Sequence, residues 1–204
     1  MVVGGGQVAH RKALGLLSCG ARVRVVAPEL VKPLRRMAER GEVEYRAKEY
    51  ERSDLKGAVL VIGATNDPEV NRRVSADARK RRMQVNIADA PELCSFIVPS
   101  VVKRGPISIA ISTGGASPAL ARKLRLELER VVGPEYGRLA SLLRQLRPHA
   151  HALVKDAAQR GKLWEQAVES EALELLRLGK RRRALDTLRK CIYSQSAQTT
   201  RRRP

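Results

Sequence analysis

The first residues of the chain have the types and spacing of a dinucleotide-binding turn. Gly4, Gly6 and Ala9 fit the pattern Gly-x-Gly-x-x-Ala, placed between an apolar segment and a helical one. The first glycine permits a tight turn, the second lets the backbone approach a pyrophosphate, and the small third residue lets the helix pack against the strand. The helix N-terminus offers free N–H groups to phosphates. We therefore expect Gly4 and Gly6 to bind a dinucleotide; the alternative is a glycine-rich turn without a ligand.

Two carboxylates farther along the chain, Glu29 and Asp89, follow apolar segments as the carboxylates of a dinucleotide-dependent enzyme would. Glu29 follows the apolar segment 23–27, with Pro28 between them, and can reach the adenosine ribose hydroxyls from a turn. No Lys or Arg stands directly at that strand end to favour a 2′-phosphate, so NAD is favoured over NADP. Asp89 follows the apolar segment 84–88, where a catalytic carboxylate would face the cofactor. The alternative for Asp89 is a turn-forming or helix-capping role.

Thr65 and Asn66 are further candidates to contact the cofactor. They follow the continuous apolar run 58–62, and loops at the carboxyl ends of parallel strands line the ligand crevice. The alternative, compatible with the first, is local: Asp67 and Pro68 fit the N-cap and first position of the next helix.

The segment 113–118 is a second polar loop. Its two glycines expose backbone N–H groups, which together with hydroxyls can bind carboxylates or phosphates. Ser117 followed by Pro118 also fits the start of a helix, and that is the simpler interpretation.

The elements that position these residues follow from hydrophobic periodicity. Five apolar segments alternating with amphipathic helices predict an α/β fold with a Rossmann-like parallel sheet. A β-hairpin follows, made of extended segments at 96–102, a turn at 103–106 and a strand at 107–112, and beyond Ser112 only helices are expected. We expect an NAD-binding domain at 1–99, a dimerisation domain of hairpin plus helix at 100–133, and a helical domain with a basic tail at 134–204. The expected helices after the hairpin are 118–132, 134–146, 150–159, a segment around Trp164 and 171–189.

Composition narrows the possible partners of the 204-residue chain. The net charge of +19 suggests an acidic partner, but aromatic content is only 3% and the basic residues are mixed with Glu, which argues against nucleic acid. No apolar run is long enough to span a membrane, and no secretion leader is apparent. Three cysteines without a CxxC pair favour a reducing, cytoplasmic location. His149 and His151 lack the spacing of zinc ligands on one helix face, so no metal site is expected.

Together these motifs resemble the bifunctional precorrin-2 dehydrogenase/sirohydrochlorin ferrochelatase family, the dehydrogenase module of siroheme synthase. The resemblance covers residues 1–150 well, and Leu163-Trp164-Glu165 is similar to the family's tail. The matching pieces, in order, are Val-Gly-Gly-Gly-x-Val-Ala-x-Arg-Lys (3–12), Val-Val-Ala-Pro-Glu (25–29), Ala-Thr-Asn-Asp (64–67), Val-Asn-x-x-Val (70–74), Asn-x-x-Asp-Ala-Pro (86–91), Ser-Phe-Ile-x-Pro-Ser (95–100) and Ile-Ser-Thr-Gly-Gly-Ala-Ser-Pro-Ala-Leu-Ala-Arg (111–122).

The resemblance implies a homodimer that oxidises precorrin-2 to sirohydrochlorin with NAD, and in many members also inserts ferrous iron to give siroheme. It implies that Asp89 is the main catalytic residue for both reactions. It also implies NAD contacts from two pairs, Gln7 with Val8 and Pro28 with Glu29. Substrate contacts are expected from Asn86, Thr113 and Ser117; Thr113 stands where some members carry a Ser.

One feature departs from the family, which has about a dozen residues before the glycine turn where this chain has three. Either the central strand is short or the true start lies upstream. A different class of function also stays open, namely a non-catalytic regulator that senses NAD or binds nucleic acid through a Rossmann domain.

Overall fold

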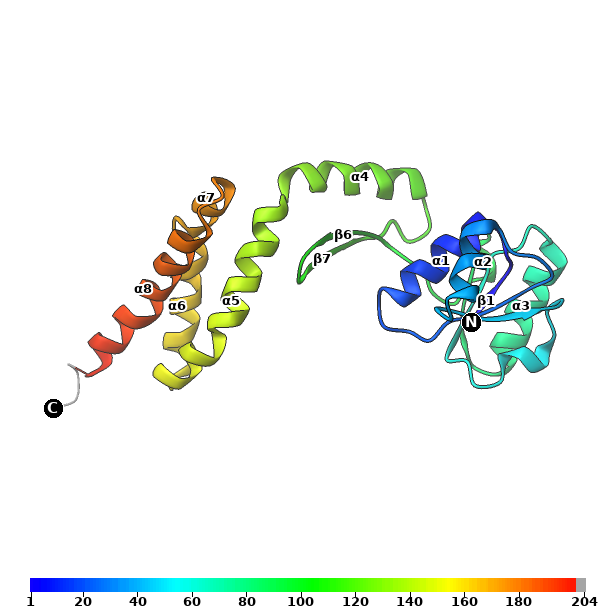
Figure 1. Ribbon diagram of the computed structural model, residues 1–204, viewed down its shortest axis with the longest axis horizontal. Helices are drawn as coiled ribbons and strands as arrows, with labels where there is room; N and C mark the ends of the chain where they lie inside the picture. Colours follow the sequence, from blue (N-terminus) through cyan, green and yellow to red (C-terminus); the bar gives the residue numbers. More distant parts are fainter. Residues whose placement is uncertain (201–204) are drawn as a thin grey trace. The chain divides into compact units, whose positions relative to one another are not determined.

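The computed structural model describes the backbone of residues 1–200 and the side chains of residues 1–193. It divides into two compact units, Met1–Val98 and the part from Pro99 onward, and each is described by itself (Figure 1). The expected frayed tail at 201–204 lies outside the described residues. Among the described residues, no helix is both long enough and apolar enough to cross a membrane.

The first unit is a five-stranded parallel sheet with the strand order β3-β2-β1-β4-β5. Strands β2 and β3 are added on one side of β1, and β4 and β5 on the other. The strand order therefore reverses between β1 and β4, where a ligand crevice is expected. Its strands are β1 (Val2–Val3), β2 (Arg24–Ala27), β3 (Glu44–Ala47), β4 (Leu60–Gly63) and β5 (Gln84–Ile87). The helices are α1 (Gln7–Leu17), α2 (Lys32–Glu39) and α3 (Pro68–Lys80), with 3₁₀ turns η1 (Arg52–Leu55) and η2 (Pro91–Leu93).

Helices cover both faces of this sheet. Val2 points into a core shared with α1 and α2, whereas its neighbour Val3 points into a core shared with α3. Because both faces are buried, the inner strands β1 and β4 are continuously apolar rather than alternating, as expected for a parallel sheet, whereas the edge strand β3 carries Glu44 and Arg46. The α/β Rossmann-like fold class is confirmed.

The central strand β1 is only two residues long. Backbone hydrogen bonds extend its pairing beyond those residues, since Ile62 N–H donates to Met1 O at 2.9 Å and Ala64 N–H donates to Val3 O at 2.7 Å. Val2 and Val3 are nearly inaccessible to solvent, with exposed fractions of 0% and 2%. A short central strand is therefore sufficient to join β2 and β4 in this structure.

The second unit begins with an antiparallel hairpin, β6 (Ser100–Arg104) and β7 (Ile107–Ile111). The hairpin is shorter than expected, because residues 96–98 belong to the first unit and the turn is the two-residue Gly105-Pro106. Helices follow: α4 (Pro118–Val131), α5 (Pro134–Leu153), α6 (Ala157–Glu169), α7 (Ala172–Arg177) and α8 (Arg181–Thr200).

Several of the expected helix boundaries are wrong. The expected helix at 150–159 and the segment around Trp164 are replaced by one helix, α6, with residues 150–153 in α5, and α8 continues past 189. Helix α5 continues through Pro148 to Leu153 instead of ending near 146, because Leu146 and Ala150 both pack into the core of the helical bundle. The expected single helix at 171–189 is broken at Gly179, whose φ is +72°. There Lys180 N–H donates to Leu175 O, which is the hydrogen bond of a glycine-terminated helix.

Candidate active site

The glycine turn lies at the reversal point of the sheet, between β1 and β4. Gly4 has a φ of +119°, a region that favours glycine, and a Cβ there would collide with the carbonyl of Ala64. Gly4 N–H donates to Val26 O at 2.9 Å, so the turn is also joined to β2. Only glycine permits this close approach of three strands.

Gly5, which the pattern leaves unspecified, is equally constrained. A Cβ on Gly5 would collide with the carbonyl of Glu29, and Val31 N–H donates to Gly5 O at 2.9 Å. The loop between β2 and α2 is thus bound directly to the glycine turn. This contact brings together the two predicted cofactor pairs, Gln7 with Val8 and Pro28 with Glu29; the run of three glycines was the signal that could have shown it.

Gly6 and the start of α1 have the properties that a pyrophosphate needs. A Cβ on Gly6 would meet no heavy atom within 4 Å, so the space above its backbone is open. Among the described residues, no side chain caps α1 and its first turn holds no acidic residue. The N–H groups of this first turn therefore face solvent with the positive end of the helix dipole. The residues present fit a dinucleotide.

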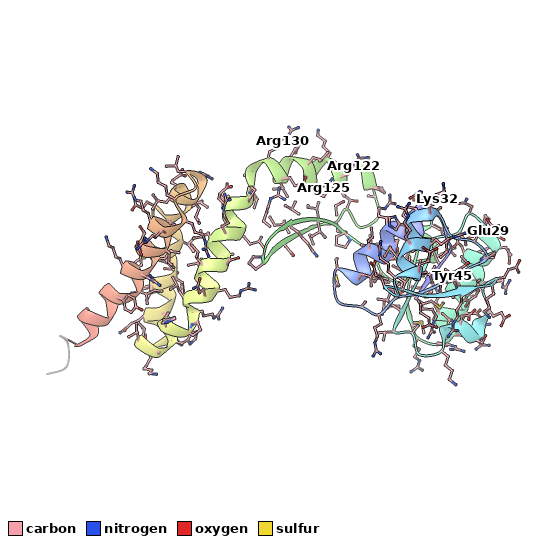
Figure 2. The ribbon with its side chains drawn as sticks, in the orientation of Figure 1. Glu29, Lys32, Tyr45, Arg122, Arg125 and Arg130 are labelled. Carbon is pink, nitrogen blue, oxygen red and sulfur yellow. The ribbon has the colours of Figure 1, made fainter. Side chains whose placement is uncertain are left out.

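Glu29 is exposed beyond the end of β2, and its loop is held from the side by Tyr45 (Figure 2). The Tyr45 hydroxyl donates to Pro28 O at 3.0 Å. Lys32 begins α2 three residues after Glu29 and, with Gln7, lines a groove of about 740 Å³ between α1 and α2. The Glu29 carboxylate therefore remains available to the hydroxyl groups of a ribose. Lys32 adds a cation to the same groove, which the sequence pattern alone did not indicate.

Thr65 and Asn66 stand at the carboxyl end of β4, beside Gly4. The Thr65 hydroxyl accepts a hydrogen bond from Asp67 N–H at 3.2 Å, and Asp67 caps α3. Asn71 Nδ2 donates to Thr65 O at 3.0 Å, which attaches this loop to α3. The local interpretation, with Asp67 as the N-cap and Pro68 in the first turn of α3, is therefore confirmed, and contact of Thr65 and Asn66 with a cofactor stays a prediction.

Asp89 is exposed beyond β5 with a φ of +60°, in the left-handed region that a non-glycine residue rarely adopts. The surrounding loop maintains this strained conformation by folding back onto β5. Ile87 N–H donates to Cys94 Sγ at 3.1 Å, and Cys94 Sγ donates to Ala90 O at 3.3 Å. Val85 N–H donates to Ser95 Oγ at 2.8 Å. The carboxylate thus belongs to a loop that several hydrogen bonds attach to β5.

Asn86 is buried beneath this loop instead of being open to a ligand. It is 6% exposed, and its Nδ2 donates to Phe96 O at 3.1 Å. Its Oδ1 accepts from Lys12 Nζ, a half-buried side chain of α1, at 3.1 Å. These contacts assign Asn86 a structural role in the loop, and direct binding of substrate by Asn86 stays a prediction. The part of Lys12 was not foreseen from the sequence.

Thr113 and Ser117 belong to the second unit, where they bond to each other. The Thr113 hydroxyl donates to Ser117 O and accepts from Ser117 N–H, both at 3.1 Å. Ser117 Oγ accepts from Leu120 N–H and so caps α4. The simpler interpretation as a helix start is therefore present in the structure. The part of the chain that the structure describes holds no group of three His, Cys, Asp or Glu suited to a metal ion.

The strand order and the glycine turn at its reversal point define a Rossmann-type dinucleotide-binding protein. Family models match in the same sense: putative NAD(P)-binding over residues 1–100, sirohaem biosynthesis protein central over 104–130, and sirohaem synthase dimerisation region over 135–192. The dimerisation description thus falls on the helical bundle, after the segment 100–133 to which the sequence assigned it.

Similar proteins agree with these regions. The chain is 44% identical over 184 residues to a siroheme synthase of Nitrosospira multiformis, covering 88% of this chain and 39% of that protein. It is 45% identical over 169 residues to one of Methylobacillus flagellatus, covering 83% and 36%. Among solved structures, SirC, a precorrin-2 dehydrogenase, matches with a TM-score of 0.75 and 28% identity, over 93% of this chain and 92% of that one.

This chain belongs to the siroheme synthase family, in the part that holds the NAD(P)-binding, central and dimerisation regions. It spans about 39% of the length of the siroheme synthases that it matches.

Proposed function

We propose that this protein oxidises precorrin-2 to sirohydrochlorin with NAD as the hydride acceptor. The observation that carries the proposal is the placement of Asp89, held in a left-handed conformation at the carboxyl edge of the same sheet that carries the glycine turn. The structural likeness to a precorrin-2 dehydrogenase over nearly the full chain supports the choice of substrate.

The cofactor-binding residues would be the glycine turn and its neighbours. The N–H groups at the start of α1 would bind the pyrophosphate above Gly6, and Glu29 would accept hydrogen bonds from the adenosine ribose. Thr65 and Asn66 would border the other side of the crevice. Bound NAD supplies the hydride acceptor.

Asp89 would act as the proton acceptor. Loss of a hydride from precorrin-2 leaves a cation, and loss of one proton then completes the new double bond. A carboxylate accepts that proton if it lies within hydrogen-bond reach of the carbon or nitrogen that carries it. The exposed position of Asp89 allows that approach, and its clasped loop limits the motion of the carboxylate.

The first prediction tests Asp89 by substitution with Asn. Asn tolerates the left-handed backbone and has nearly the same shape but cannot accept the proton. We expect Asp89→Asn to lose about 10²–10⁴-fold in kcat, as for removal of a general base. The melting temperature and NAD affinity should stay within experimental error of the native protein.

The assay follows NADH formation and tetrapyrrole absorbance after precorrin-2 and NAD are mixed. Full activity in Asp89→Asn would exclude Asp89 as the base. An intact protein without turnover would contradict the dehydrogenase and favour the regulator; NAD binding alone would then point to a sensor, and salt-sensitive binding to duplex DNA to a nucleic-acid regulator.

Insertion of ferrous iron into sirohydrochlorin is the second reaction proposed for Asp89. The product in the relatives' name, siroheme, favours it. The reaction replaces two pyrrole N–H protons by the ion, and an exposed carboxylate can accept one of them. Supplying sirohydrochlorin and ferrous iron without NAD tests this step separately from the oxidation.

We further propose that the protein is a cytoplasmic homodimer. Cys19, Cys94 and Cys191 form no disulfide with one another, as expected in a reducing compartment. Leu120, Leu124 and Val131 share one face of α4 and remain 38–66% exposed, which suits contact with a second copy.

A further inference from the structure

A lysine on the cofactor-binding helix reaches the base of the Asp89 loop. Ala9 and Ala13 of α1 are completely buried, and such small residues let this helix pack close to the sheet. Between them in sequence, Lys12 extends to β5, where its Nζ donates to Asn86 Oδ1 at 3.1 Å. The two bonded residues are 74 positions apart in the chain. This hydrogen bond joins the helix that would bind the pyrophosphate to β5, directly before the loop that carries Asp89.

The contact determines how the Asn86 side chain is oriented. Because Lys12 is a donor without acceptor capacity, it requires the oxygen of the Asn86 amide to face α1. The Asn86 nitrogen is then directed to Phe96 O at 3.1 Å and Cys94 Sγ at 3.5 Å, on the far end of the Asp89 loop. One buried amide thereby connects Lys12 to both the beginning and the end of that loop.

The charged group of Lys12 is partly buried, and its surroundings affect its pKa. Burial, with the positive charge of Arg11, lowers the pKa of Lys12, whereas Cys94 and Asp89 act in the opposite direction. Among the described residues, Lys12 has no carboxylate within ion-pair distance, so its cation is not neutralised by a salt bridge.

We propose that Lys12 is a positioning residue for the dehydrogenase reaction, which fixes the Asn86 amide and holds the Asp89 loop in register with the cofactor helix. This inference rests on the proposed function. Hydride and proton acceptors must keep a fixed separation, and a displacement of about 1 Å can reduce the rate by about 10²-fold. Lys12 acts through Asn86 and the loop, and the transferred proton goes to Asp89.

The test compares Lys12→Met, Lys12→Gln and Lys12→Arg with Arg11→Met, a control that removes an exposed cation from the adjacent position of the same helix. We expect Lys12→Met to lose about 10–100-fold in kcat, while the KM for NAD changes less than twofold. Lys12→Arg should recover most of the lost rate because it keeps both donor and charge. Arg11→Met should stay within twofold of the native protein. Lys12→Gln, which keeps a neutral donor, should fall between Met and Arg.

A second readout needs neither cofactor nor turnover. The side-chain NH₂ resonances of Asn86 in the protein alone should shift and exchange faster with solvent in Lys12→Met, and recover in Lys12→Arg. Native kcat in Lys12→Met, an equal loss in Arg11→Met, or unchanged Asn86 resonances would each overturn the proposal. If the native protein itself shows no turnover, the proposed function fails, and the Asn86 resonances still decide whether Lys12 holds the amide.

Discussion

At the scale of single residues, the three consecutive glycines differ in their surroundings, which the sequence pattern alone does not distinguish. Gly4 and Gly5 are glycines because the protein's own backbone is too close for a side chain. Gly6 is surrounded by open space and has a φ of −82°, a conformation open to any residue. The first two glycines therefore serve the fold, whereas the open space at Gly6 supports its proposed role in binding the pyrophosphate.

This difference predicts opposite outcomes for two alanine substitutions. Gly5→Ala should destabilise the protein by about 1–3 kcal/mol, because the new methyl group overlaps the Glu29 carbonyl. Gly6→Ala should leave the melting temperature unchanged and weaken NAD binding by about tenfold or more, since its methyl group occupies the pyrophosphate space. Thermal unfolding and calorimetric titration with NAD measure the two effects. Equal NAD affinity in Gly6→Ala and the native protein would place the pyrophosphate elsewhere.

At the scale of elements, the edge strand β3 is attached to the turn η1 by a buried carboxylate. Asp54 is 1% exposed and accepts hydrogen bonds from Arg46 Nη1 and from Glu51 N–H, both at 3.0 Å. Lys48 Nζ lies 3.3 Å from the other side of the same group. Burial alone would raise the pKa of Asp54, but these three donors outweigh it and hold the pKa below its ordinary value.

The lowered pKa of Asp54 predicts how stability depends on pH. A carboxyl group whose pKa is lower in the folded than in the unfolded protein stabilises the fold above the unfolded pKa of about 4, and this contribution is lost as pH falls through the folded pKa. Asp54→Asn should therefore cost about 1–3 kcal/mol at pH 7, and the difference should shrink below pH 4. Urea unfolding of both proteins from pH 7 to pH 3 measures it. A difference that is constant with pH would exclude the ionised Asp54 as its cause.

At the scale of the whole molecule, the exposed apolar face of α4 predicts where two copies meet. The hairpin and α4 bury only Val102 and Ala121 completely or nearly so, whereas the helical bundle has a large core of its own. Val131 on α4 is 66% exposed and Val168 on α6 is 52% exposed, so Val168 is a suitable control position for a substitution at Val131.

We expect Val131→Asp to convert the dimer into a monomer and Val168→Asp to leave it intact, as measured by sedimentation velocity. A charge placed in an apolar interface is costly, whereas a charge on a solvated helix face is not. The reverse result would move the contact to the bundle, the region that carries the dimerisation description.

The sequence by itself determined the α/β class, the glycine turn and the position of Asp89 after a buried strand. These features depend on local patterns, namely apolar periodicity and the small residues that a tight turn requires. The helix boundaries near Pro148 and Gly179 were less predictable, because packing of Leu146 and Ala150 overrides the local effect of a proline.

Only the tertiary structure decided what surrounds these residues. Three contacts each join residues at least 17 positions apart: the close approach of Gly5 to the Glu29 carbonyl, the hydrogen bond from Tyr45 to Pro28 and the hydrogen bond from Lys12 to Asn86. Such contacts depend on which strands become neighbours, and the order β3-β2-β1-β4-β5 brings Asn86 of β5 within reach of the Lys12 side chain although most of the first unit separates them in the chain. The sequence thus proposed Asp89 as the catalytic residue, and the fold showed that Asn86 lies beneath the Asp89 loop and accepts a hydrogen bond from Lys12.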